Sequence, residues 1–204
     1  NVNYEAKNVS NLKDDTTSEV FGGLGYFTKI DLFKEKKNSW KQFLTPKALL
    51  RYAPGHMRRE TGKHRLSNMD LFSIDRMNSY NNFENGLSAS LGFDYKRSLL
   101  NDDGSTSEEK FTFSAGQVIS ESENSDIPSS TSLDQRFSDL VGEAKLNLKN
   151  NLDLNYNFAI DQNYKEFNYN EIGADLSVNK TKFNISYLEE TNHIGKQEYI
   201  KTGI

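Results

Sequence analysis

The chain has 204 residues, of which 35% are hydrophobic and 12% aromatic, and its formal net charge is −4. No apolar run is long enough for a transmembrane helix, and the mildly acidic balance gives no reason to expect nucleic-acid binding. The absence of cysteine excludes a disulfide framework and a thiolate metal site within these residues. Because the sequence begins at Asn1 rather than at a methionine, we expect it to be a piece of a longer protein.

Alternating apolar and polar residues predict β-strands along most of the chain, because successive side chains of a strand point to opposite faces of a sheet. The predicted strands are residues 19–33, 42–53, 87–97, 109–120, 139–148, 151–161, 167–178 and 181–190, and 197–204 has the pattern of the start of a further strand. Within 167–178 the apolar positions change parity, which predicts a β-bulge near Glu171. These strands of roughly ten residues have the length that a tilted membrane-spanning strand needs.

The connections between the predicted strands alternate in length. Two are long, at residues 54–85 and 121–137, and both fall at the same end of the predicted sheet, whereas most of the others are short or tight. Outer-membrane β-barrels have short periplasmic turns and longer extracellular loops, and soluble sandwiches do not need this asymmetry.

The two faces of the predicted strands differ in chemistry. In the strand 151–161 one face would carry only apolar side chains and would contact lipid: Leu152, Leu154, Tyr156, Phe158 and Ile160. A Lys or Arg that faces lipid near mid-bilayer costs about 2–4 kcal/mol, so the charged face of each strand should point to a wet lumen. The predicted lumen-facing residues are Lys29, Asp31, Lys47, Arg51, Asp94, Lys96, Asp153, Asn155, Asn157 and Asp161.

The pattern favours an antiparallel transmembrane β-barrel, of which residues 1–204 would form an incomplete part of about eight strands. A large soluble antiparallel sheet with one wet face gives the same alternation and stays open as an alternative. No catalytic or metal-binding motif stands out, and His56, His64 and His193 have no evident acidic or serine partner. We therefore predict that the segment is not an enzyme and has no cofactor or metal site.

One cluster of basic residues lies in the first long loop, in the stretch RYAPGHMRRETGKHR at 51–65. Arginine side chains match the geometry of phosphate groups, so Arg58, Arg59, Lys63 and Arg65 are candidates for contact with a phosphorylated lipid. The alternative is that this loop is merely solvated.

Three segments carry a resemblance to a known family: FLTPKALLRYAPG (43–55), NMDLFSIDRMNSYNNFENG (68–86) and SDLVGEAKLNLKNNLDLNYNFAID (138–161). In this order they resemble the barrel domain of the LptD family, the lipopolysaccharide-assembly proteins of the outer membrane that are also called organic solvent tolerance proteins. The middle segment has the family's loop residues in step: Leu71, Phe72, Asp75, Arg76, Glu84 and Gly86. It departs from the family pattern at Asn81 and Asn82, where Asp-Arg is frequent, and at Ser79, where Gly is usual.

The resemblance implies an outer-membrane barrel of a Gram-negative cell that passes lipopolysaccharide to the outer leaflet. It also implies a plug lipoprotein like LptE in the lumen, and periplasmic bridge proteins that dock on a jellyroll domain outside this sequence. Another outer-membrane porin or receptor barrel, or a soluble β-rich surface-binding domain, remains the alternative to this function.

Overall fold

A computed structural model of the chain describes residues 2–9, 14–36, 39–55, 57–62, 64–77, 79, 82–101, 105–148, 151–192 and 195–204. It is built from strands and loops, with a single turn of 3₁₀-helix at Ser129–Thr131. No helix among the described residues is long and apolar enough to cross a bilayer.

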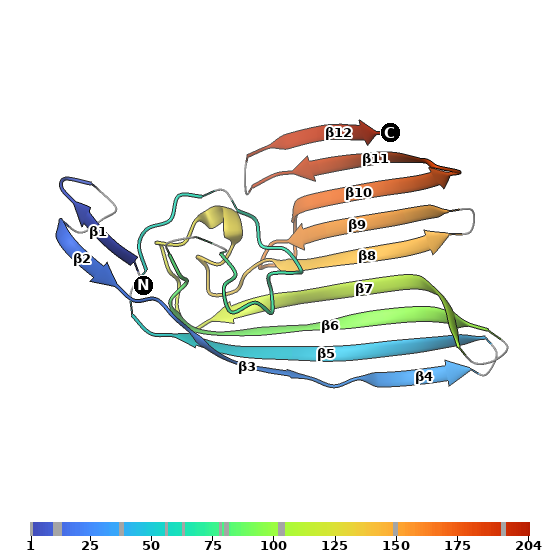
Figure 1. The fold of residues 1–204 in the computed structure, drawn as a ribbon, viewed down its shortest axis with the longest axis horizontal. Helices are drawn as coiled ribbons and strands as arrows, with labels where there is room; N and C mark the ends of the chain where they lie inside the picture. Colours follow the sequence, from blue (N-terminus) through green and yellow to red (C-terminus); the bar gives the residue numbers. More distant parts are fainter. Residues whose placement is uncertain are drawn as a thin grey trace.

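Ten strands of the described residues form one antiparallel sheet in the order β12-β11-β10-β9-β8-β7-β6-β5-β3, with β4 paired to β5 as well (Figure 1). From β5 to β12 chain neighbours are also sheet neighbours. The strands are β3 (Leu24–Lys29), β4 (Leu32–Lys36), β5 (Trp40–Ala53), β6 (Gly86–Leu100), β7 (Thr106–Ser120), β8 (Leu140–Leu148), β9 (Leu152–Ile160), β10 (Phe167–Val178), β11 (Thr181–Glu190) and β12 (Gln197–Gly203). A separate hairpin joins β1 (Val2–Ala6) to β2 (Asp15–Glu19), where no strand was predicted before residue 19. The predicted all-β antiparallel fold is confirmed.

The structure divides the predicted strand 19–33. Residues 20–23 lie outside any strand, and β3 and β4 are separated by Ile30 and Asp31, although both pair with β5. The interruption lies opposite Pro46, which has no N–H to donate to a sheet ladder. The Ile30 N–H still donates to the Pro46 carbonyl at 3.1 Å, and the Thr45 hydroxyl donates to the Asp31 carboxylate at 2.8 Å.

The bulge in β10 lies nearer the start of the strand than predicted. The register with β9 shifts between Phe167 and Tyr169, so the extra residue is Asn168 rather than a residue near Glu171. Asn168 is buried, and its amide donates to the Asp139 carboxylate at 2.9 Å. The hydrogen bond between Asn168 and Asp139 therefore accompanies the bulge at the start of β10. The alternation of apolar residues along the sequence does not reveal such a polar contact.

The two long loops lie at the same end of the sheet and fold over one of its faces (Figure 1). We call the covered face the inner face and the opposite one the outer face. Loop residues Met57, Leu66, Leu71, Met77, Ile127 and Leu133 form one buried cluster with strand residues Val118, Val141, Ala159, Tyr169 and Leu188. The hydrophobic core of this segment therefore lies between the inner face and the loops.

Candidate functional site

The first long loop docks where two strand glycines face each other. Gly92 of β6 pairs with Gly116 of β7, and a Cβ atom at these positions would lie 3.1 Å from Phe72 Cζ and 2.9 Å from Leu71 Cδ1, respectively. Leu71 is fully buried in this place. Glycine within a strand often marks a close approach of another chain segment, and here it makes room for the loop.

A buried charge network holds the same loop to the inner face. Arg76 donates to both oxygens of Glu84, with Nε 2.9 Å from Oε2 and a shorter contact from Nη2 to Oε1. It also donates to the hydroxyls of Ser88 at 2.7 Å and Ser90 at 3.2 Å on β6. The Arg76 side chain is fully buried and that of Glu84 is 3% exposed, so this two-pronged pair is almost completely removed from water.

Arg51 of β5 brings a second cation to Glu84. Its Nη1 lies 3.8 Å from Glu84 Oε1, its Nη2 donates to the Glu84 backbone carbonyl, and its Nε donates to the Ile74 carbonyl at 2.7 Å. The guanidinium also lies 4.9 Å from the centre of the Phe83 ring. Arg51 thus binds both ends of the segment 74–84 and holds them against the inner face of the sheet.

Arg65 connects the first long loop to the distant strands β10 and β11. Its guanidinium lies 3.5 Å from the centre of the Tyr169 ring on β10, and Nη1 is 3.1 Å from Glu190 Oε2 on β11. The Tyr169 hydroxyl donates to Glu171 at 2.6 Å. The loop between β5 and β6 therefore spans the inner face as far as β11.

The second long loop, 121–137, joins this assembly through backbone and side-chain hydrogen bonds to the first long loop. The Glu60 N–H donates to the Asp126 carbonyl at 2.8 Å, and the Asn124 amide donates to Asn85 Oδ1 at 2.8 Å. Where this loop returns to the sheet, Ser138 Oγ accepts the Val118 N–H at 2.9 Å. Ser138, the first residue of the S-D-L-V motif, thus satisfies a backbone N–H of β7 just before β8 begins.

The predicted lumen-facing residues lie on the inner face wherever they belong to a strand. Lys47 and Asp94 form an ion pair at 2.7 Å, and Asn155 donates to Asp175 at 3.2 Å. Arg51 is inward but buried beneath the loop rather than solvated. The register of the ladders places four others on the same face: Lys29, Lys96, Asp153 and Asn157. Asp31 lies between β3 and β4, where its carboxylate accepts the hydroxyl of Thr45.

Asp161 differs from the other predicted lumen residues because β9 ends at Ile160. Its carboxylate accepts the N–H groups of Lys165 at 2.7 Å and Glu166 at 2.9 Å, which closes the turn to β10. These backbone donors, Glu166 foremost, lower the pKa of Asp161 below its usual value. Asp161 is therefore a turn residue.

The predicted lipid-facing residues of β9 share the outer face. In the register of the sheet, Leu152, Leu154, Tyr156, Phe158 and Ile160 lie in line with Ile172 and Leu176 of β10, both exposed. Further exposed apolar residues on the outer face are Leu24, Tyr26, Leu44, Leu50, Leu91, Phe183, Ile185 and Ile200.

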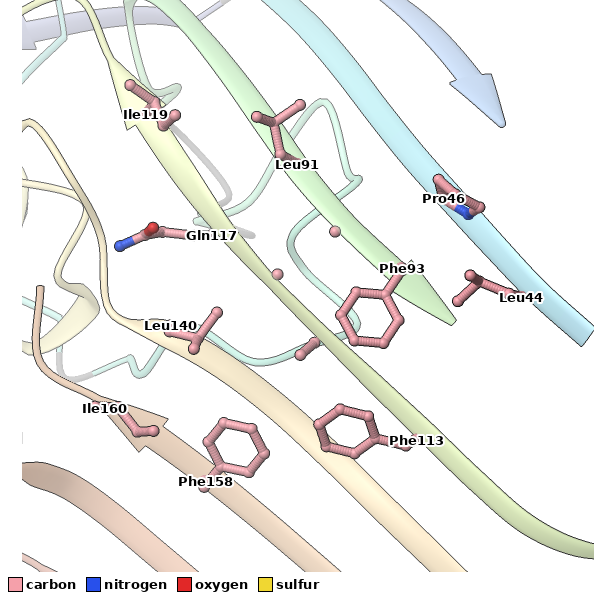
Figure 2. A pocket seen from close by; sticks show the side chains of 13 residues that line it. Leu44, Pro46, Leu91, Phe93, Phe113, Gln117, Ile119, Leu140, Phe158 and Ile160 are labelled. Atoms are coloured by element: carbon pink, nitrogen blue, oxygen red, sulfur yellow. The ribbon is translucent and has the colours of Figure 1, made fainter. Parts of the chain in front are cut away.

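The outer face is hollowed over β5 to β9. Figure 2 shows the phenyl rings of Phe93, Phe113 and Phe158 around this hollow, which has a volume of about 910 Å³. Phe158 covers Gly142 of the neighbouring strand, where a Cβ atom would lie 2.6 Å from Phe158 Cζ. An aromatic ring over a cross-strand glycine is a recognised way to protect the exposed backbone there.

The predicted basic cluster is not brought to a single place. Arg65 faces inward to Glu190, whereas Arg59 is exposed and Arg58 lies 5.3 Å from the centre of the Tyr4 ring of the N-terminal hairpin. Lys63, together with His56 and His193, lies outside the described residues. The three candidates that the structure describes, Arg58, Arg59 and Arg65, therefore have different surroundings.

One titratable pair lies in the same loop. His64 Nε2 is 3.6 Å from Asp70 Oδ2, and this carboxylate raises the pKa of His64 although partial burial opposes the shift. Burial acts to raise the pKa of Asp70, but contacts with His64 and Ser67 outweigh it and lower that pKa. The pair fixes the turn at Ser67–Asp70 most firmly when His64 is protonated.

Comparison with known protein families identifies the family of this chain. The sequence matches the family described as LPS transport system D (LptD) over residues 13–203. The chain belongs to this family. No curated protein matches the chain. Family membership identifies the segment as part of a lipopolysaccharide transport and assembly protein of the outer membrane, and the predicted resemblance is confirmed.

The three segments that carried the resemblance have structural roles. The first contains Arg51, the second contains Arg76 and Glu84, and the third begins at the hydrogen-bonded Ser138. Sequence reasoning did not predict that the loop turns inward. The signals that could have indicated it are the two mid-strand glycines and the inward serines Ser88 and Ser90, which are poor choices for an unoccupied strand surface.

Proposed function

We propose that this chain forms part of a barrel wall that delivers lipopolysaccharide to the outer leaflet of the outer membrane of a Gram-negative cell. The observation that supports this most is the separation of an apolar outer face from a polar inner face in a sheet of the lipopolysaccharide transport family. The outer face would contact lipid, where a charge is costly, and the inner face would line a lumen.

The two ends of the inner face suit different neighbours. Near the long loops it is closed by the buried cluster around Leu71. Near the short turns it carries a hollow of about 350 Å³ with a mixed polar and apolar lining, in which Lys145, Asp153, Asn155 and Asp175 supply charged and polar groups. Such a surface fits a plug protein like LptE with complementary polar groups, which would enter from the periplasmic side, and bridge proteins would dock through a jellyroll domain outside this sequence.

The proposal is tested by depletion of the full-length protein in its own cell. We expect lipopolysaccharide to disappear from the cell surface and to accumulate in internal membranes, and restored expression should reverse both effects. A depleted cell that keeps normal surface lipopolysaccharide would refute the proposal. An unrelated outer-membrane porin, assayed in the same cells, controls for general failure of barrel assembly.

We also propose that basic residues of the first long loop contact lipid phosphates as the lipid emerges. Arg59 is exposed, and Arg58 holds its guanidinium near the aromatic rings of Tyr4 and Phe21 at the loop end of the sheet. Exposed charge-assisted contacts are screened by salt and each contributes up to about 1 kcal/mol, so the effect should be graded.

The combined replacement Arg58→Ser, Arg59→Ser and Lys63→Ser should raise the permeability of the outer membrane to large antibiotics while barrel abundance stays unchanged. A single Arg59→Ser replacement should do little. Arg65→Ser serves as a separate arm because Arg65 binds Glu190, so it tests the structure of the loop. Normal permeability of the triple variant would show that these residues are merely solvated.

A further inference from the structure

The hollow on the outer face has the character of a binding groove. Its lining comes from five consecutive strands, β5 to β9, and is apolar except for Gln117 (Figure 2). Phe93, Phe113 and Phe158 form walls, while Ala115, together with Gly92 and Gly116, which are paired across β6 and β7, forms a low floor. Small residues at paired positions between large rings create a depression that bulkier side chains would fill.

The one polar side chain marks an end of the groove. Gln117 Oε1 accepts the Tyr164 hydroxyl at 2.7 Å, and Gln117 Nε2 donates to the Ser138 carbonyl at 2.7 Å. Gln117 therefore meets the apolar space with its amide already hydrogen-bonded. Tyr164 belongs to the turn after β9, at the end of the sheet that carries the long loops, and a tyrosine there is typical of the level where acyl chains give way to headgroups.

The groove is wide as well as apolar. Four inter-strand spacings separate β5 from β9, which corresponds to about 19 Å across the sheet. A single acyl chain would leave most of this width empty, and water would be poorly accommodated on such a surface. A lipid that carries several acyl chains on one headgroup fills the width best.

We propose that this groove binds the acyl chains of one lipopolysaccharide molecule of the outer leaflet, with its headgroup at the level of Gln117 and Tyr164. The choice of lipid rests on the proposed function, and the groove lies on the lipid-facing surface, apart from the loop-covered inner face. The bound molecule would stay on the barrel wall after delivery and would cover the low floor at Ala115.

The test uses the full-length protein in vesicles of phosphatidylethanolamine and lipopolysaccharide, followed by mild detergent extraction and native mass spectrometry. Wild-type protein should retain one lipopolysaccharide molecule. Ala115→Phe should reduce the retained fraction about tenfold, because a ring on the floor excludes apolar contacts of the chains. The matched control is Ala174→Phe on the outer face of β10, outside the groove, which should retain lipid as the wild type does.

A second pair avoids any folding defect caused by a larger side chain. Leu91 lines the groove and is 50% exposed, whereas Leu50 is 54% exposed on the same face and is not among the lining residues. Leu91→Ala should weaken retention and Leu50→Ala should not. Gel mobility before and after heating verifies that each variant is a folded barrel.

Equal retention by Ala115→Phe and Ala174→Phe, or by Leu91→Ala and Leu50→Ala, would overturn the proposal. Retention of phosphatidylethanolamine in place of lipopolysaccharide would overturn the choice of lipid, and retention of a protein would overturn a lipid site. The mass-spectrometry assay measures lipid retention and not lipopolysaccharide delivery, so these results would leave the proposed function intact. The proposed function is refuted only if depletion of the protein leaves surface lipopolysaccharide normal.

Discussion

Replacement of Glu84 by alanine should release the first long loop from the inner face. Glu84 is the acidic partner of two buried arginines, Arg76 and Arg51, and the variant would leave both guanidinium groups without this carboxylate. Loss of one partner from a buried ion pair costs about 3–5 kcal/mol, much of it because the remaining charge stays desolvated. The loop would avoid this cost by opening, so that the arginines reach water.

Limited trypsin digestion of the folded full-length protein in vesicles measures the opening, because Arg58 and Arg59 are cleavage sites in the same loop. When the loop recloses faster than it is cut, the cleavage rate follows the open population. A cost of about 3–5 kcal/mol corresponds to an increase of roughly two to four orders of magnitude, up to the rate of a fully open loop. Glu84→Gln keeps the shape without the charge and should fall between Glu84→Ala and the wild type.

The matched control is Glu123→Ala, since Glu123 is exposed in the second long loop. This variant should be cut at the wild-type rate. If Glu84→Ala is cut no faster than Glu123→Ala while gel mobility shows a folded barrel, the buried network does not hold the loop, and the reasoning from burial and geometry is refuted.

Two further predictions concern the faces of the sheet and the pH dependence of the loop. Leu154→Arg should destabilise the barrel by about 2–4 kcal/mol in denaturant titrations in vesicles, whereas Asn155→Arg should cost far less, and equal costs would show that the faces are misassigned. The pKa of His64 is raised in the folded loop, so its contribution to stability is fully present below pH about 6.5 and is lost as the pH rises through the folded-state value. Trypsin cleavage, normalised to a free peptide, should therefore be modestly faster at alkaline pH, by an effect below about 1 kcal/mol because the pair is partly exposed. His64→Asn should remove this dependence, and an unchanged pH profile in that variant would contradict the assignment to His64.

The faces of the strands were predictable from the sequence because they follow from local periodicity. Leu154 and Asn155 alternate across β9 whatever the rest of the chain does, so their faces could be assigned without knowledge of distant contacts. The same holds for the pairing of consecutive strands, because short turns join antiparallel neighbours. The interruption between β3 and β4 was missed because its cause, Pro46, lies in the partner strand.

The inward course of the first long loop was not predictable in this way. It depends on contacts between residues far apart in the chain, such as Arg51 with Glu84 and Arg65 with Glu190. A basic stretch in a polar loop has the same composition whether its arginines bind phosphate, water or a buried carboxylate. Hence composition pointed to an anion site, while the structure shows that Arg65 already has an acidic partner within the chain.

The two sides of β7 connect the loop to the groove. Gly116 faces inward and receives Leu71, whereas its neighbour Ala115 faces outward and forms the groove floor. These two adjacent small residues give this part of β7 no large side chain of its own on either face, which weakens its cross-strand contacts. The loop restores packing on the inner side, since Leu71 is fully buried there, and a bound lipid would restore it on the outer side. The same small residues that admit the loop therefore also create the outer depression, so the buried arginine network that holds the loop supports the wall behind the proposed lipid site.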